Sequence, residues 1–185
     1  SVFVTGTREP LTANATVVDP AVVRSLQPAT SDTATLLRGV PGISFYGAGG
    51  VSSLPSIRGL ADDRIRIKVD GMDLIAACPN HMNPALSYLD PSNVGMLTVY
   101  AGVAPVSVGG DSIAGTILAT TPAPVFAQPG EGLLAKGEVG GFYRSNGNAM
   151  GGNVSATLAN ESFSMTYAGA VAESDNYVAG RDFKT

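Results

Sequence analysis

The stretch Ile65-Arg66-Ile67-Lys68-Val69-Asp70-Gly71-Met72 sets the pattern for the first 122 residues of the chain. Apolar β-branched residues at every second position predict a strand over residues 65–69, and Asp70-Gly71 is typical of a tight turn. Other short segments of this kind are bounded by Gly, Asp or Pro residues. We expect further strands at residues 2–5, 43–45, 56–58, 96–100 and 116–120.

Two helices are predicted between these strands. An aspartate followed by a proline opens residues 19–26, as expected for an N-cap residue and the first helical position. A second helix is expected over residues 31–38, capped by Ser31 or Thr30 and ended by the glycines and proline of residues 39–42. Helices and strands interspersed in this way predict an α/β domain, in which short helices surround a small mixed sheet.

A change of composition at Pro122-Ala123-Pro124 separates this domain, residues 1–122, from residues 123–185. Beyond it, Gly-rich segments alternate polar and apolar residues with a period of two, which predicts antiparallel strands joined by tight turns. We expect the turns at Asn146-Gly147 and at residues 159–161. The apolar faces comprise the odd-numbered residues 133–143, the even-numbered residues 150–158 and the odd-numbered residues 163–171.

Alternation of this kind has two interpretations. Strands of about ten residues with tight turns are typical of the hairpins of a transmembrane β-barrel. A soluble antiparallel sheet that packs one face on a core gives the same alternation. Three strands cannot close a barrel, and an open sheet edge would leave backbone groups unpaired in lipid. Under the barrel interpretation we therefore expect the chain to be a fragment of a longer protein.

The overall composition argues against several functions. A net charge of −4 at pH 7 disfavours a nucleic-acid partner, because phosphate binding requires a basic surface. No run of about 18 apolar residues occurs, so no transmembrane helix is predicted. The chain has a single histidine and neither a P-loop nor a Ser–His pairing motif. We therefore predict that it is not an enzyme and uses no catalytic cofactor.

Several motifs of the first domain follow one another in a fixed order. They are Leu36-Leu37-Arg38-Gly39-Val40-Pro41-Gly42-Ile43, Ile57-Arg58-Gly59, the stretch 65–72, and the segments 96–107 and 109–117. In this order and spacing, with an opening strand at residues 2–8, they resemble the plug domain of TonB-dependent receptors. Ala104 stands where that family usually has a glycine.

The resemblance implies a transporter of the bacterial outer membrane. The plug would gate the lumen of a β-barrel whose first strands lie in residues 123–185. It also implies TonB as the energising partner, outer-membrane lipid around the barrel, and a metal ion or metal chelate as cargo. No TonB box is assigned in the sequence, so the contact with TonB is implied by the resemblance alone. We expect a scarce nutrient as cargo, with copper among the candidates and a siderophore or other metal chelate as the alternative.

The segment Ala77-Cys78-Pro79-Asn80-His81-Met82-Asn83-Pro84 combines three types of metal-ligating side chain. Thiolate and thioether sulfur favour Cu(I), and imidazole suits copper and zinc. Cys78 and Met82, with His81 as an additional ligand, are therefore candidates for a partial copper site. Their Cys-x-x-x-Met spacing resembles the copper receptors of the family, in which further ligands come from the barrel. The alternative is structural, since Cys and Met also serve as apolar packing residues.

Hypotheses from other classes remain open at this point. One is a soluble copper-binding module, in which the strands after Gly132 would pack on the core of the module itself. Another is an adhesion domain of β-hairpins without a metal, which leaves the ordered motifs unexplained. Within the first domain, Arg58 could form ion pairs with Asp62, Asp63 or Asp70, or these charges could be solvated.

Overall fold

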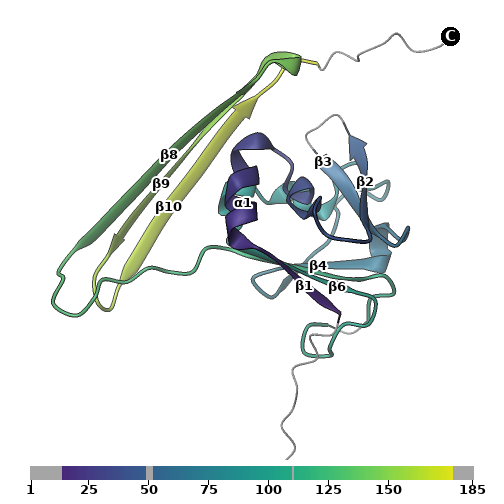
Figure 1. The fold of residues 1–185 in the computed structure, drawn as a ribbon, viewed down its shortest axis with the longest axis horizontal. Coiled ribbons are helices and arrows are strands. Elements are labelled where there is room, and N and C mark those ends of the chain that lie inside the picture. Colours follow the sequence, from purple (N-terminus) through teal and green to yellow (C-terminus); the bar gives the residue numbers. More distant parts are fainter. Residues whose placement is uncertain (1–13, 49–51, 110, 177–185) are drawn as a thin grey trace, which may run out of the picture.

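The computed structural model describes residues 14–48, 52–109 and 111–176. A rounded N-terminal domain lies beside a long, three-stranded sheet, and an extended segment connects the two (Figure 1). The strand expected at residues 2–5 lies outside the described residues. The architecture confirms the predicted order, a mixed-sheet domain with short helices followed by antiparallel hairpins.

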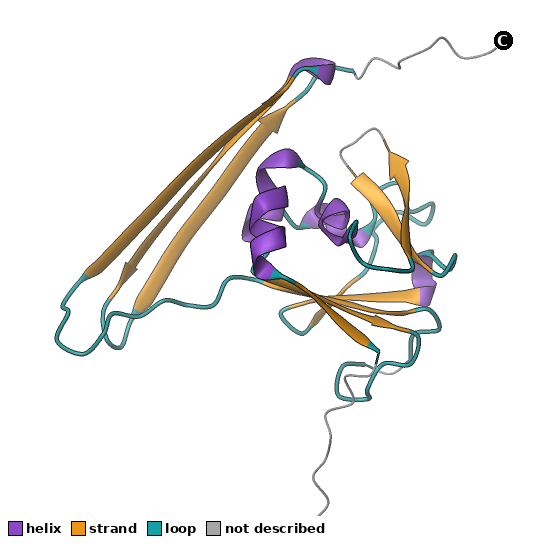
Figure 2. Cartoon of the chain, viewed as in Figure 1, coloured by secondary structure: helices purple, strands orange, loops and turns teal. Residues whose placement is uncertain are grey.

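The N-terminal domain is built on a five-stranded mixed sheet (Figure 2). In spatial order its strands are β1 (Ala15–Val18), β6 (Met96–Ala101), β7 (Gly115–Thr120), β4 (Ile65–Val69) and β5 (Met72–Leu74). Strands β4 and β7 are parallel, whereas the other neighbours are antiparallel. A separate hairpin pairs β2 (Ile43–Ala48) with β3 (Ser52–Ile57).

The turn between β4 and β5 forms as its Asp-Gly sequence predicts. Asp70 and Gly71 have φ angles of 49° and 84°, the left-handed conformation that a two-residue hairpin turn requires. The Asp70 carboxylate also accepts hydrogen bonds of 2.9 Å from the backbone N–H and from the hydroxyl of Thr121. This turn therefore fixes the end of β7, immediately before the chain leaves the domain.

Short helices cover the sheet. The helix predicted over residues 19–26 is confirmed as α1 (Pro20–Leu26), and Asp19 Oδ1 accepts a hydrogen bond of 2.8 Å from the N–H of Ala21. The other helical segments are 3₁₀ turns. In this domain they are η1 (Gln27–Ala29), η2 (Thr33–Leu37), η3 (Asp62–Arg64), η4 (Ala85–Tyr88) and η5 (Pro91–Asn93), whereas η6 (Asn146–Asn148) lies outside it, in a turn of the second sheet.

The second predicted helix differs from expectation in type and cap. It is the 3₁₀ segment η2, and its cap is Asp32 rather than Ser31 or Thr30. Asp32 has an extended backbone, and its Oδ1 accepts from the N–H of Ala34 at 3.1 Å. The Thr30 hydroxyl instead accepts from the N–H of Asp32, at 2.9 Å. The carboxylate of Asp32 thus caps η2, while the hydroxyl two residues earlier holds the backbone of Asp32 itself.

A single apolar core lies between this sheet and the helical segments. In β4 the alternation predicted from the sequence is observed, with Ile65, Ile67 and Val69 buried and the two basic residues between them half-buried. The largest fully buried apolar side chains are Leu36, Leu37, Ile57, Leu86, Leu97 and Ile117.

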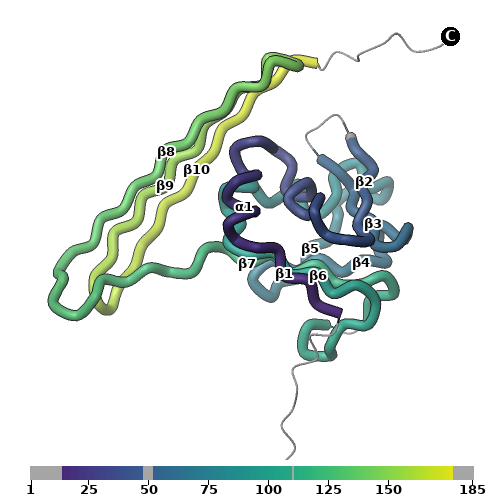
Figure 3. The backbone as a smooth tube through the Cα atoms, viewed as in Figure 1, coloured from purple at the N-terminus to yellow at the C-terminus, as the bar shows by residue number. Residues whose placement is uncertain are grey.

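The second sheet consists of β8 (Leu134–Arg144), β9 (Ala149–Ala159) and β10 (Ser164–Glu173), in the antiparallel order β10-β9-β8. Its register places Val139 opposite Val154, which in turn faces Gly169, so the predicted apolar positions share one face. The large apolar side chains of that face are exposed. The tube in Figure 3 shows the three strands running alongside the N-terminal domain. Among the described residues, no helix has the length and apolarity to cross a membrane.

Candidate functional site

The candidate metal ligands lie in the loop of residues 75–84, which connects β5 to η4. Tyr88, at the end of η4, holds this loop. Its hydroxyl accepts from the N–H of Ala77 at 3.0 Å and donates to the carbonyl of Asn83 at 3.3 Å. A turn within the loop is closed by the N–H of His81, which donates to the carbonyl of Cys78 at 2.9 Å. The backbone therefore brings Cys78 and His81 close together.

The three candidate side chains have different surroundings. Cys78 is a free, half-buried cysteine, whereas the Met82 side chain is open to solvent, with 68% of its surface exposed. His81 adopts a φ of 51° and only 18% of its side chain is exposed. Its Nε2 lies 3.9 Å from Oδ1 of Asp62 and also 3.9 Å from Oδ1 of Asp63, both in η3. The imidazole therefore faces two carboxylates that the sequence did not link to it.

The side chains of this loop do not form a complete metal site by themselves. Within the described part of the chain, no group of three or more His, Cys, Asp and Glu side chains is arranged to hold a metal ion. The thiol and the thioether remain, and these are the ligand types that favour Cu(I). The loop can contribute two sulfur ligands, and a complete shell would need ligands from other segments.

A pocket of about 330 Å³ opens beside this loop, between the β2–β3 hairpin and the β4–β5 hairpin. His81, Asp62 and Asp63 line one side of it. Arg66, Asp73 and Asp111 line another part of its wall, and the remaining lining is largely apolar. Neither Cys78 nor Met82 is among the lining residues. The pocket and the two sulfur side chains are therefore separate features of the same region, and His81 is the candidate residue that lines the pocket.

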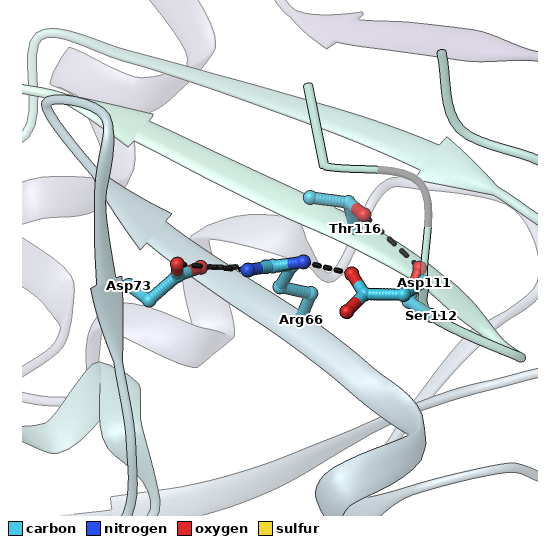
Figure 4. A network of polar contacts seen from close by, with 5 residues as sticks. All are labelled: Arg66, Asp73, Asp111, Ser112 and Thr116. Atoms are coloured by element: carbon cyan, nitrogen blue, oxygen red, sulfur yellow. Dashed lines mark hydrogen bonds and ion pairs between the residues drawn. The ribbon is translucent and has the colours of Figure 1, made fainter. Parts of the chain in front are cut away.

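An ion-pair network fixes one wall of the pocket (Figure 4). Arg66 donates two hydrogen bonds to the carboxylate of Asp73, at 2.6 and 2.9 Å, and a further one to Asp111. Hydrogen bonding from Arg66 lowers the pKa of Asp73, and the same contact raises the pKa of Arg66. The hydroxyls of Ser112 and Thr116 lie 3.1 Å apart and join the Asp111 segment to β7.

Of the two alternatives given for Arg58, ion pairs or solvated charges, the ion pairs are not formed. Among the described residues, Arg58 forms no ion pair with Asp62, Asp63 or Asp70. The two η3 carboxylates face His81, and Asp70 accepts hydrogen bonds from Thr121. The ion pairs of this region are formed by Arg66 instead, a residue that the alternation of β4 directs away from the core. Sequence reasoning missed this network because its three members come from β4, β5 and a loop 45 residues from Arg66.

Comparisons with a family model and with solved structures point to the same family. Residues 7–116 match the family model described as the TonB-dependent receptor plug domain, which is more than half of the chain. No curated protein matches the sequence significantly.

Solved structures extend the likeness into the second sheet. The structure titled "Copper transporter OprC" is 28% identical, has a TM-score of 0.71, and is matched over 88% of this chain and 24% of its own. The FrpB iron transporter from Neisseria meningitidis is 23% identical with a TM-score of 0.73, over 93% of this chain and 25% of its own. The siderophore receptor PirA from Pseudomonas aeruginosa is 18% identical with a TM-score of 0.60, over 89% and 29%. The chain thus spans about a quarter of the length of the solved structures it matches.

Proposed function

Because this chain belongs to the TonB-dependent receptors, a non-enzymatic family of the bacterial outer membrane, we propose that it forms the plug and first wall strands of a nutrient importer. The observation that carries this proposal is the match of residues 7–116 to the plug, together with the mixed-sheet fold of the domain. In this function the plug gates the lumen of the barrel. TonB is the proposed partner that supplies the energy for opening it.

We assign the second sheet, β8–β10, to the wall of the barrel and call it the wall sheet. The distribution of its apolar side chains supports this assignment. Its apolar face is solvent-exposed along all three strands and points away from the plug. Its other face is more polar and contacts the plug through Arg144, which hydrogen-bonds Ser31. An outward apolar face and an inward polar face are what a strand of a transmembrane barrel requires. Outer-membrane lipid would cover the apolar face.

Copper is the cargo that we propose for this importer. Cys78 and Met82 would contribute sulfur ligands from the loop 75–84, and His81 would be an additional, weaker ligand. The exposed Met82 thioether and the adjacent half-buried Cys78 thiol support this assignment. The 28% identity to a protein titled a copper transporter supports it as well. The remaining ligands would come from the rest of the wall.

The alternative cargo is a siderophore or another metal chelate. In that case the plug would contact the chelating molecule rather than the ion, and the loop 75–84 would have a structural role. Family membership argues against the soluble copper-binding module considered from the sequence, because the plug motifs belong to a membrane receptor.

Metal content of the full-length receptor tests the copper proposal. The receptor is purified in detergent from outer membranes, and bound copper is measured by mass spectrometry for wild type and for Cys78→Ala with Met82→Ala. We expect copper in the wild type and its loss in the double variant. Met72→Ala is the matched control, because Met72 has the same 68% exposure but lies in β5. Copper retained by the double variant, or absent from the wild type, would contradict the copper assignment and favour a metal chelate as the cargo.

A further inference from the structure

Arg144 joins the first wall strand to the plug at a distance of 113 residues along the sequence. It is the last residue of β8, and its Nη2 donates a hydrogen bond of 2.6 Å to the hydroxyl of Ser31. Ser31 lies between η1 and η2, and η1 packs against β8. The contact therefore connects the helical layer of the plug to the end of β8 that is remote from the connecting segment (Figure 1).

The Arg144 side chain is held in place by its own sheet. Its guanidinium carbon lies 4.3 Å from the centre of the Phe142 ring, a cation–π geometry. Phe142 pairs with Gly151 across β8 and β9, and its ring covers that glycine. A Cβ at Gly151 would lie 2.6 Å from Phe142 Cε1 and 2.6 Å from the backbone oxygen of Val171, so a larger residue would displace the ring and strain the β9–β10 pairing. Gly151 thus leaves space for Phe142, which orients Arg144 toward Ser31.

The polar groups at this contact are incompletely satisfied. Within the described residues, Arg144 Nε and Asp32 Oδ2 are both buried without a hydrogen-bond partner. Asp32 follows Ser31 directly, and 1% of its surface is exposed. The contact itself is a single hydrogen bond to a neutral hydroxyl, and the unpaired Nε adds the cost of a buried polar atom. A single hydrogen bond is lost once its two heavy atoms separate beyond about 3.5 Å, so a displacement of about 1 Å between the plug and β8 is enough to break it.

The opposite end of the sheet has its own attachment. There the N–H of Ala127 donates to the carbonyl of Asn160 at 3.2 Å, and the N–H of Gly130 donates to Glu161 Oε1 at 2.6 Å. These bonds tie the connecting segment to the β9–β10 turn. Loss of the Arg144 contact would therefore free the plug near Ser31 while the wall stays attached at its other end.

We propose that Arg144 is a positioning residue that holds the plug against the first wall strand through its hydrogen bond to Ser31. Phe142, which lies over Gly151, orients the Arg144 side chain, and the hydrogen bond breaks when the plug moves. The proposal rests on the proposed function, since it assigns a role to a plug–wall contact. It predicts that the hydrogen bond from Arg144 limits the motion of the segment around η2, whether or not cargo is bound.

Amide hydrogen exchange of the full-length receptor in detergent tests this role. We expect Arg144→Met and Ser31→Ala each to speed exchange in residues 30–37 by about tenfold, the effect of losing one charged hydrogen bond. The double variant should exchange no faster than the single ones, because both changes remove the same interaction. Lys136→Met is the matched control, since it removes a cation from the same strand and face. Exchange in β8–β10 should stay at its wild-type rate, which shows that the sheet is folded.

Two further variants separate positioning from mere packing. Arg144→Lys keeps a donor for Ser31 and should restore part of the protection that Arg144→Met loses. Phe142→Leu removes the ring that contacts the guanidinium and should lower protection as Arg144→Met does, while both partners of the hydrogen bond are kept. Wild-type exchange in Arg144→Met, or additive effects in the double variant, would overturn the proposal. Copper content of the same samples is a separate readout, so a receptor without copper that still shows these exchange differences would contradict only the cargo assignment.

Discussion

The plug sheet and the wall sheet share one sequence pattern and use it in opposite ways. In β4 of the plug, the apolar residues of the alternation are buried against the helices and the β2–β3 hairpin. In β8 of the wall, Val139 occupies an equivalent position in the pattern and is 83% exposed. Alternation therefore predicts that a strand has an apolar face, but the medium that covers this face is decided by the next layer of structure.

The difference also separates two kinds of stability. The plug has its own apolar core, so its free energy of unfolding depends on packing within the domain. The outer face of the wall sheet has no covering layer in the part of the chain that the structure describes (Figure 2). The apolar side chains on this face stabilise the fold only when a medium such as lipid removes them from water. Four experiments separate the two regions, and they follow in order of decreasing effect.

The largest effect is expected for Gly115→Ala at the start of β7. Gly115 has a φ of 146°, and a Cβ there would lie 2.1 Å from the carbonyl oxygen of Tyr100, which is backbone. Strands β6 and β7 would have to separate, so we expect the plug to lose more than about 5 kcal/mol. Native-state hydrogen exchange of β6 and β7 measures this loss. Gly39→Ala is the control, because a Cβ at Gly39 meets nothing within 4 Å; equal effects of the two would refute the steric argument.

The same leucine-to-alanine change should act differently in the two regions. Leu97 of β6 is fully buried, so Leu97→Ala should cost about 4 kcal/mol through lost burial and a residual cavity. Leu158 of β9 is 51% exposed and would face lipid, which closes around a smaller side chain, so Leu158→Ala should lose apolar transfer free energy but no cavity term, about 1–2 kcal/mol. Unfolding of the receptor in denaturant, followed by exchange in each region, gives both values. Similar values would mean that the wall sheet has a covering layer of its own.

A charge on the outer face tests the medium directly. Val139 is in the middle of β8, so Val139→Arg should destabilise the receptor in a bilayer by about 3 kcal/mol, the cost of a cation near the membrane midplane. Glu138→Arg places the same side chain on the opposite face and should be nearly neutral. The folded fraction in lipid vesicles, measured by electrophoretic mobility, distinguishes them. An equal loss in both variants would show that the two faces meet similar surroundings.

The smallest effect is a pH dependence confined to the plug. The hydrogen bond from Arg66 lowers the pKa of Asp73 in the folded state, so its stabilisation is present above the ordinary carboxyl pKa. It is lost as the pH falls through the lowered value, when Asp73 becomes protonated. The pair is exposed to solvent, which screens it, so the change should be small. Exchange in β5 between about pH 6 and pH 2 measures it; Asp73→Asn should remove the difference, and an unchanged profile would argue against the pair.

Local sequence signals predicted the elements whose structure is locally determined. Asp19-Pro20 was sufficient for α1, and Asp70-Gly71 was sufficient for the β4–β5 turn. Strands β1 and β5 were missed, because β1 is four residues long at a sheet edge and β5 is only three residues long. Their strand conformation comes from pairing with β6 and β4, which a sequence pattern does not record.

The sequence predicted which types of side chain the candidate site contains, but it did not predict how they are arranged. The segment 77–84 shows its sulfur and imidazole groups by sequence alone. The sequence does not show that His81 turns toward Asp62 and Asp63 while Met82 remains exposed, because this depends on where η3 lies in the fold. The copper assignment of Cys78, His81 and Met82 therefore stays a prediction.

The parallel pairing of β4 with β7 has a consequence for the order of folding. The β4–β5 hairpin is local and can form early, but Ile65 faces Gly115 and Ala15 faces Tyr100. These pairings close long loops, which costs chain entropy before any contact is gained and makes such steps slow. The Asp70 carboxylate reaches Thr121 only when β7 is seated. The loop that carries Cys78 and Met82 lies inside the β4–β7 crossover, so it is enclosed in the same late step that completes the sheet.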